Sequence, residues 1–220
     1  IAAPILRYFY VQQQWRQQVQ AESSARLQAL QARIRPHFLF NSMNTIASLT
    51  RSRPEQAETA VENLADLFRA SMNEQRLHRW QDEQLLCQRY LEIEAMRLGA
   101  RLRVDWQVEA LPADALLPPL VLQPLLENAI YHGIEPLAQG GVITIQGARQ
   151  DGQLSLRVEN PVADAESHHH RGNRLALENI RERITTLFGR AGTLQATQHD
   201  HHYSVTLSFP YRARHEDFDR

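Results

Sequence analysis

The chain contains no lysine, and all 24 of its basic residues are arginine. In a P-loop, a lysine reaches the β- and γ-phosphates of the nucleotide, so the absence of lysine excludes that class of nucleotide-binding protein. Any contact with phosphate must come from arginine, histidine, backbone amides or a metal ion. The sequence therefore has to be searched for those groups.

Cysteine is nearly as scarce. The single cysteine, Cys87, excludes an intrachain disulfide and suits a reducing compartment. Because Cys87 lies in a segment with helical spacing, we expect its side chain to be buried and to pack as a small apolar residue rather than to serve as a reactive thiol. The formal net charge is only −1, so no strong field attracts nucleic acid, and we expect no direct nucleic-acid binding.

The first residues are apolar over a short stretch only. Residues 1–11 are interrupted by Arg7 and are too short to span a bilayer, which needs about 20 apolar residues. Two interpretations stay open: residues 1–20 are the cytoplasmic end of a transmembrane helix or a linker, or they are a frayed amphipathic end. Because the first residue is Ile1 rather than methionine, we expect the chain to be part of a longer protein.

Residues 21–99 have little turn chemistry and predict a helical region. At its start, apolar residues follow the three-four spacing of a helix that packs in a coiled coil or bundle (Leu27, Leu30, Ile34). Pro36 should bend the helix, so that a new buried stripe follows and His37 faces outward (Leu39, Met43, Ile46). After a turn, Pro54 suits the start of a second helix with its own stripe (Val61, Leu64, Phe68, Met72). Two one-sided helices need partners, so we expect a homodimer with a four-helix bundle.

A third helix is predicted from about Asp82, as a cap, to Leu98, with Gly99 ending it. From Ala100 the pattern changes to strands and helices. We expect strands at 101–109, 142–148, 154–159, 193–198 and 203–209, and helices ending near Tyr131 and over 173–188. Helices gathered on one face of a mostly antiparallel sheet predict an α+β sandwich over 100–212, followed by a polar tail at 213–220.

The sequence Pro36-His37-Phe38-Leu39-Phe40-Asn41 offers an imidazole as a nucleophile. A histidine with an unperturbed pKa of about 6.5 is mostly neutral at cytoplasmic pH. Asn41 lies one helical turn after His37 on the same face and can donate a hydrogen bond to the ring or to a phosphate oxygen. We interpret His37 and Asn41 as a candidate phosphate-accepting site.

A second polar cluster lies about ninety residues later, in Glu127-Asn128-Ala129-Ile130-Tyr131-His132-Gly133. Asn128 and His132 are neighbours at i and i+4 on a helix, and Glu127 is adjacent. An amide oxygen is a hard ligand that suits Mg²⁺, and a histidine can hydrogen-bond phosphate. The alternative is a polar exposed face of an amphipathic helix.

These two motifs resemble the LytS/YehU-type sensor histidine kinases over residues 27–210. The phosphoacceptor helix of that family contains Pro-His-Phe-Leu-Phe-Asn, and the N-box of its GHKL-type ATPase domain resembles residues 122–133. The resemblance implies that His37 is phosphorylated from ATP and that Asn128 is the Mg²⁺ ligand. It also implies an upstream membrane sensor at the bacterial inner membrane, with this chain on its cytoplasmic face, and a LytTR-type response regulator as partner.

The chain departs from the family pattern in three places. Tyr131 stands where a lysine is common, and Asn160, in Val158-Glu159-Asn160-Pro161, stands in the motif that reads adenine. The glycine-rich lid keeps one glycine, Gly172, while Arg174 can supply phosphate charge. A weakened kinase is therefore one interpretation. One alternative is a pseudokinase, scaffold or phosphatase that controls its regulator by binding. A second alternative is a free-standing GHKL ATPase, but that function does not explain the presence of the Pro36-His37 helix.

Two further groups receive simpler interpretations. The histidine clusters lack the cysteine or carboxylate partners of a built metal site, so we expect a polar lid rather than metal binding (His168, His169, His170; His199, His201, His202). Arg181 and Arg183 are expected to mark a solvated helix face.

Overall fold

The protein is represented by a computed structural model, which describes residues 36–72, 77–163 and 171–213. Predictions for residues 1–35, for the three consecutive histidines 168–170 and for most of the tail lie outside these ranges. Within them, no helix is long and apolar enough to cross a bilayer.

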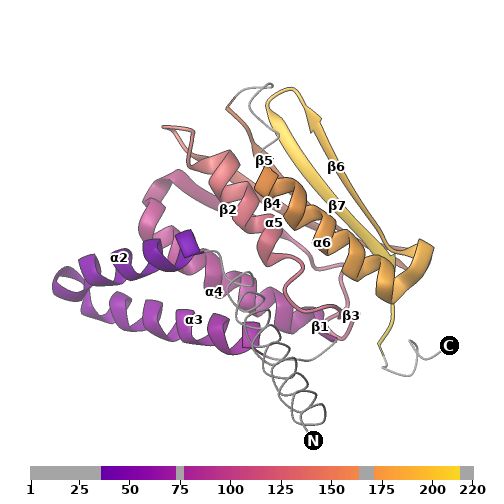
Figure 1. Cartoon of the computed structure of the whole chain (residues 1–220), viewed down its shortest axis with the longest axis horizontal. Helices are drawn as coiled ribbons and strands as arrows, with labels where there is room; N and C mark the ends of the chain where they lie inside the picture. Colours follow the sequence, from indigo (N-terminus) through magenta and orange to yellow (C-terminus); the bar gives the residue numbers. More distant parts are fainter. Residues whose placement is uncertain (1–35, 73–76, 164–170, 214–220) are drawn as a thin grey trace, which may run out of the picture.

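The first two helices form a hairpin at one end of the molecule (Figure 1). Helix α2 spans Pro36–Ser52 and helix α3 spans Pro54–Met72. The break falls at Arg53, because Pro54 has no N–H to continue α2 and its fixed φ suits the start of α3. The predicted helix start at Pro54 is confirmed.

The predicted stripe of α2 is confirmed only in part, since Leu39 and Ile46 pack against the core while Met43 is exposed. Met43 is 54% exposed, and Leu39 and Ile46 are only partly buried. The buried face carries Phe38, Ser42, Thr45 and Leu49 instead. The two hydroxyls can be buried because each donates to the carbonyl four residues earlier, at 2.8 and 2.9 Å.

The stripe of α3 was predicted only in part. Leu64 is buried and Phe68 is partly buried, but Val61 and Met72 are more than half exposed. The remaining buried positions of α3 are mostly small or polar (Ala57, Ala60, Asn63, Leu67, Ser71). Small residues allow a close approach to α4, and Asn63 finds a side-chain partner there. Apolar spacing alone therefore selected the wrong face at two positions.

Helix α4 spans Trp80–Leu98, and it begins at Trp80 rather than at the predicted cap Asp82. Gly99, at φ +57°, ends it as predicted, since only glycine adopts that conformation without strain. Cys87 is fully buried, which confirms the packing prediction. Burial raises the pKa of its thiol well above the usual range, and Glu83 and Glu127 add to that shift.

A five-stranded sheet has the order β2-β4-β5-β7-β6. Its strands are β2 Leu102–Gln107, β4 Gly141–Gln150, β5 Gln153–Pro161, β6 Thr193–His199 and β7 His202–Pro210. The β2–β4 pair is parallel and the others are antiparallel. The predicted β4–β5 hairpin is confirmed, with Asp151 and Gly152 at positive φ in its two-residue turn.

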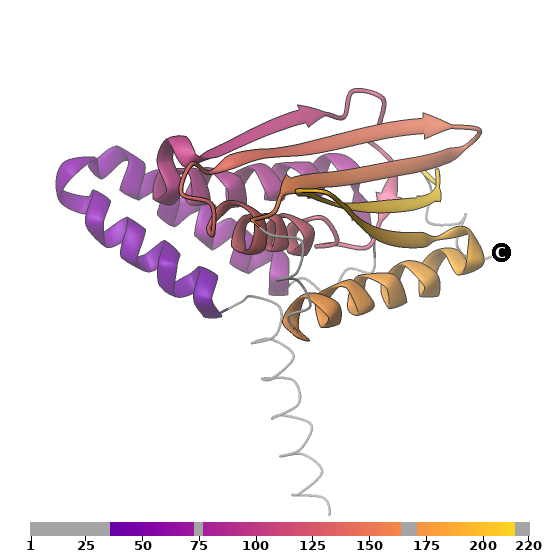
Figure 2. The ribbon, with the colours of Figure 1, turned by 90° about the horizontal axis from the view of Figure 1, so that it is seen from above.

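Helices cover one face of this sheet (Figure 2). They are α5, Gln123–Asn128, which continues as the π-helix η2, Ala129–Ile134, and α6, Arg171–Phe188. Short elements complete the described parts: β1 His78–Arg79 pairs with β3 Leu116–Leu117, and η1 Gly99–Arg101 and η3 Gly189–Ala191 follow α4 and α6. The buried side chains of sheet and helices form one core, which confirms the predicted α+β class.

Candidate functional site

His37 is the second residue of α2, and its side chain is exposed. The Asn41 amide nitrogen lies 3.3 Å from Nδ1 and 3.4 Å from Nε2 of the ring. An amide N–H can donate only to a ring nitrogen that carries no proton, so the nitrogen that accepts depends on the tautomer of the ring. The predicted pairing of His37 with Asn41 along one helix face is present in the structure.

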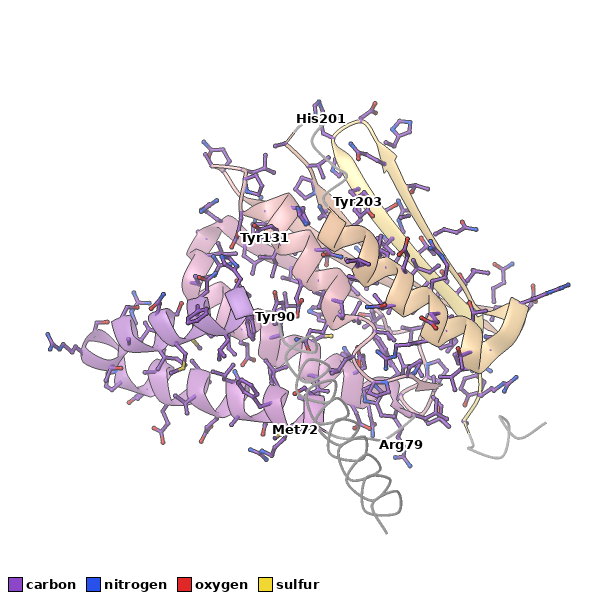
Figure 3. All side chains as sticks on the ribbon, in the orientation of Figure 1. Met72, Arg79, Tyr90, Tyr131, His201 and Tyr203 are labelled. Carbon is purple, nitrogen blue, oxygen red and sulfur yellow. The ribbon has the colours of Figure 1, made fainter. Side chains whose placement is uncertain are left out.

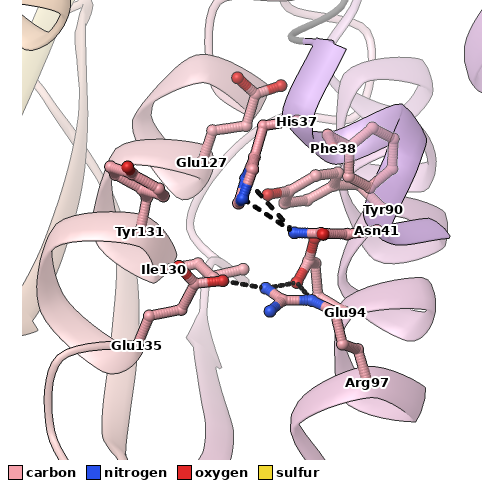
Figure 4. A pocket seen from close by; sticks show the side chains of 10 residues that line it. All are labelled: His37, Phe38, Asn41, Tyr90, Glu94, Arg97, Glu127, Ile130, Tyr131 and Glu135. Carbon is pink, nitrogen blue, oxygen red and sulfur yellow. Dashed lines mark hydrogen bonds and ion pairs between the residues drawn. The ribbon is translucent and has the colours of Figure 1, made fainter. Parts of the chain in front are cut away.

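A cleft of about 320 Å³ lies between α2, α4 and the α5–η2 segment (Figure 4). His37 and Asn41 line it from one side, and residues of α5–η2 line it from the other. The complete lining is His37, Phe38, Asn41, Tyr90, Glu94, Arg97, Glu127, Ile130, Tyr131 and Glu135. The structure thus brings together two motifs that lie about ninety residues apart in sequence.

Tyr131 of the second motif contacts His37 of the first motif. Its ring centroid lies 5.5 Å from that of His37, with the planes at 82°, and 4.8 Å from that of His132. Edge-to-face geometry is a favoured arrangement of aromatic rings. The side chain is 46% exposed. A tyrosine at this position therefore orients the imidazole without adding the positive charge of a lysine.

Arg97 forms one wall of the cleft together with two glutamates (Figure 4). Its guanidinium pairs with Glu94 on α4 and, at 2.5 Å, with Glu135 just after η2. Burial raises the pKa of Glu94, and Glu135 adds to the rise, while Arg97 and His37 oppose it. The bridge ties α4 to the segment after the second motif and places the guanidinium in the cleft that His37 also lines.

The raised pKa of Glu94 predicts a pH dependence of stability. The folded state holds the proton of Glu94 more tightly than the unfolded state, whose pKa is about 4.3. The contribution of Glu94 is therefore fully present below about pH 4.3 and is lost as pH rises through its folded pKa. Urea unfolding of wild type and Glu94→Gln from pH 4 to 7 should show the wild type losing stability relative to the variant as pH rises. A difference that does not change with pH would contradict this.

Glu127 faces the same cleft as His37 and is buried. The Gln123 side-chain amide donates to Glu127 Oε1 at 3.0 Å, which fixes the carboxylate from one turn earlier. A carboxylate in a cleft beside an imidazole can accept the ring proton when the other ring nitrogen reacts. The sequence identified Glu127 as the neighbour of Asn128. That Glu127 lines the same cleft as His37 comes from the tertiary structure.

Asn128, His132 and Gly133 of the second motif lie outside this cleft lining. Asn128 is buried on α5, and Gly133 packs against Asn160 at the end of β5. A Cβ on Gly133 would lie 2.3 Å from Asn160 Nδ2, so a larger residue does not fit there. Asn160 is also buried, and its Nδ2 donates to Pro161 O at 2.8 Å. Gly133 and Asn160 thus meet where η2 packs against β5.

Gly172 and Arg174 occupy the first turn of α6. The helix begins at Arg171 rather than at the predicted Asn173, so both residues have helical backbone instead of forming a loop. An arginine and an alanine in place of lid glycines favour helix, since glycine costs about 1 kcal/mol relative to alanine inside a helix. Farther away, His199 and His202 are paired in register on the exposed β6–β7 hairpin, and His199 pairs with Asp200 at 2.9 Å.

The prediction that Arg183 lies on a solvated face is wrong. Arg183 donates to the backbone carbonyls of Pro119 at 2.5 Å and Leu120 at 3.4 Å. From the other side, the buried carboxylate of Glu83 accepts the amides of Leu120 and Leu122, both at 2.7 Å. Leu120 has φ +57°, a conformation that a leucine keeps only when its surroundings hold it. The loop before α5 is thereby clamped by α4 and α6.

Sequence reasoning missed this clamp and the Arg97 bridge. The spacing of Glu94 and Arg97 on one helix is a signal of an ion pair, but such pairs are common on solvated faces. Nothing in the local sequence around Glu83 or Arg183 indicates a loop forty or sixty residues away. Only the packing of α4 and α6 against α5 brings these groups to their partners.

Comparison with known proteins shows that the chain belongs to the sensor histidine kinases. Residues 25–102 match the family described as histidine kinase. The sensor histidine kinase YpdA of Escherichia coli (strain K12) is 32% identical over 76% of this chain and 31% of that protein. The sensor histidine kinase/phosphatase LytS of Staphylococcus aureus (strain Mu50) is 30% identical over 88% of this chain and 35% of that protein. The chain thus spans about a third of the length of these curated relatives.

Among solved structures, the Acinetobacter baumannii histidine kinase AdeS superposes with a TM-score of 0.48 at 16% identity. The match covers 72% of this chain and 80% of that one. A score in this range describes a partial superposition.

Proposed function

Because the chain carries a histidine kinase family region and is related to the LytS-type sensor histidine kinases, we propose that it transfers the γ-phosphoryl group of ATP to His37. An aspartate of a response regulator then receives the group. The observation that carries the proposal is the cleft that exposed His37 and buried Glu127 both line. A scaffold alone gives no reason for that juxtaposition.

In the proposed reaction, the unprotonated ring nitrogen of His37 attacks the γ-phosphorus. A P–N bond forms, the bond from the γ-phosphorus to the β,γ-bridging oxygen breaks, and ADP leaves. Glu127 accepts the proton from the other ring nitrogen, so that the phosphorylated imidazole ends neutral. Tyr131 holds the ring in position during this exchange, while the Asn41 amide releases the unprotonated nitrogen so that its lone pair can attack.

The residues next to the cleft suit a magnesium nucleotide. Asn128 offers a hard amide oxygen, and His132 can hydrogen-bond phosphate. Bound Mg²⁺ would neutralise charge on the phosphate oxygens. Asn160, with Gly133 packed against it, keeps its side-chain oxygen for an adenine amino group. Gly172 and Arg174 belong to the first turn of α6, and the backbone amides at the start of a helix favour anions.

Labelling with ATP that carries radioactive γ-phosphate tests the proposal. Wild type should acquire acid-labile, base-stable label, and His37→Ala should lose at least about 1,000-fold of it because the nucleophile is gone. His199→Ala, which removes an exposed histidine of the β6–β7 hairpin, serves as the matched control and should label like wild type. Label that survives in His37→Ala, or an unlabelled wild type, would overturn the proposal.

A second candidate is a pseudokinase or phosphatase that controls its regulator with little autokinase activity. It is favoured by one observation, the helical backbone at Gly172 and Arg174 where a flexible glycine lid is expected. A titration with millimolar Mg·ATP separates the two functions. Saturable binding supports the kinase, and the absence of binding supports the rival.

The partners belong to the same proposal. Exposed apolar side chains on α2 and α3 support a homodimer (Phe40, Met43, Val61, Met72). The motif resemblance further suggests a likeness to the alginate-biosynthesis sensor kinase AlgZ, also called FimS, with a LytTR-type, AlgR-like regulator as partner. We place this chain at the cytoplasmic face of the bacterial inner membrane, joined to an upstream transmembrane region.

A further inference from the structure

We infer that His37 receives its phosphoryl group from the nucleotide held by its own chain and not from a dimer partner. This inference rests on the proposed kinase function and adds which of the two chains holds the nucleotide that phosphorylates His37. Within one chain, His37 already lines the cleft that Glu127 lines, and its ring meets Tyr131 at 5.5 Å. The question is whether other contacts hold α2 in that place.

Helices α2 and α3 are fixed on α4 by buried and polar contacts. The rings of Phe38 and Tyr90 are 4.8 Å apart, and both are buried. Asn63 Nδ2 donates to Glu92 Oε2 at 2.7 Å. Asp66 pairs with Arg89. Because Phe38 is adjacent to His37, the Phe38–Tyr90 contact directly determines where the acceptor imidazole sits relative to α4.

Helix α4 is fixed in turn on the nucleotide side. Arg97 pairs with Glu135 just after η2, and Glu83 accepts the backbone amides of Leu120 and Leu122 just before α5. These two contacts hold both ends of the α5–η2 segment against one helix. Helix α4 therefore contacts both α2, which carries the acceptor, and the ends of the α5–η2 segment, which carries Glu127; Figure 4 shows these elements around the cleft.

The length of the chain limits exchange of the helical hairpin between protomers. Four residues separate Met72 from Leu77, and an extended connection of that length spans roughly 18 Å at most. A hairpin can reach the α4 of a partner only if that helix begins within this distance. It would then have to repeat the Phe38–Tyr90 and Asp66–Arg89 contacts on the other chain.

Mixed dimers of two differently tagged chains, purified through both tags, test the inference with the full chain. The first pair joins a His37→Ala chain to an Asn128→Asp chain, which has an intact acceptor but an impaired nucleotide site. We expect no label above that of either variant homodimer. The second pair joins wild type to a chain that carries both substitutions, and we expect about half the label of the wild-type homodimer.

Transfer between protomers reverses both results. The first pair would then be labelled, and the second would not, which overturns the inference. An unlabelled wild-type homodimer overturns the proposed function itself and is thus distinguishable. Asn128 is buried, so thermal melts check that its variant folds, and Asn128→Ala replaces it where the aspartate does not. If the protein is monomeric, a labelling rate per chain that does not fall on dilution supports the inference, and one that falls overturns it.

Discussion

Glu83→Ala is expected to lower the free energy of unfolding by about 3–5 kcal/mol, the range for removing one partner from a buried charged network. The carboxylate is fully buried, accepts the amides of Leu120 and Leu122 at 2.7 Å, and pairs with His78 Nε2 at 2.8 Å. Its loss leaves two buried N–H groups without an acceptor. Urea unfolding followed by circular dichroism measures the change.

The neighbouring exposed carboxylate provides the control. Asp82→Ala removes a charge from the same first turn of α4 and should change stability by less than about 0.5 kcal/mol. If the two variants are equally stable, the clamp on the loop before α5 contributes nothing. Partial recovery in Glu83→Gln, which keeps one acceptor oxygen, would show that the amides of the loop matter more than the charge.

Glu127→Gln is expected to lower the rate of autophosphorylation by about 100-fold or more, the usual contribution of a positioned general base. The glutamine keeps the shape of the side chain and can still hydrogen-bond Gln123, but it cannot accept the proton of His37. Single-turnover labelling at saturating Mg·ATP isolates this step, because nucleotide affinity then no longer affects the rate.

Glu62→Gln, on the exposed face of α3, is the matched control and should leave the rate unchanged. Thermal melts of both variants show whether the fold is kept. Equal labelling rates for wild type and Glu127→Gln would exclude proton acceptance by Glu127, although His37 could still be the acceptor. Loss of nucleotide binding in the same variant would instead assign Glu127 to the nucleotide.

Much of the α+β part was predictable because its signals are local. Alternation of apolar residues marks β4 and β5, and Asp151-Gly152 can adopt the positive φ values that a two-residue turn requires. Gly99 and Pro54 mark the end and the start of helices for similar backbone reasons. In each case one or two residues determine the geometry, so no distant partner has to be known.

The helical hairpin was less predictable because burial depends on what lies opposite. Ser42 and Thr45 are buried since they satisfy their hydroxyls on their own helix, while the apolar side chain of Met43 is exposed. Arg183 looked solvated from its position on α6, yet it donates to carbonyls more than sixty residues away. Hydrophobic periodicity cannot identify polar residues that become buried because the fold supplies their hydrogen-bond partners.

The sequence alone predicted His37 and Asn41 as a candidate phosphate-accepting pair, the Glu127 motif and the class of fold, because each depends on residue type and short spacing. The tertiary structure decided that His37 and Glu127 share one cleft within one chain, and that Arg97 and Glu83 hold α4 against α5 and η2. The physical reason is that a buried ion pair or an aromatic contact joins groups whose separation along the chain has no periodicity. Only the packed core sets the distance between them.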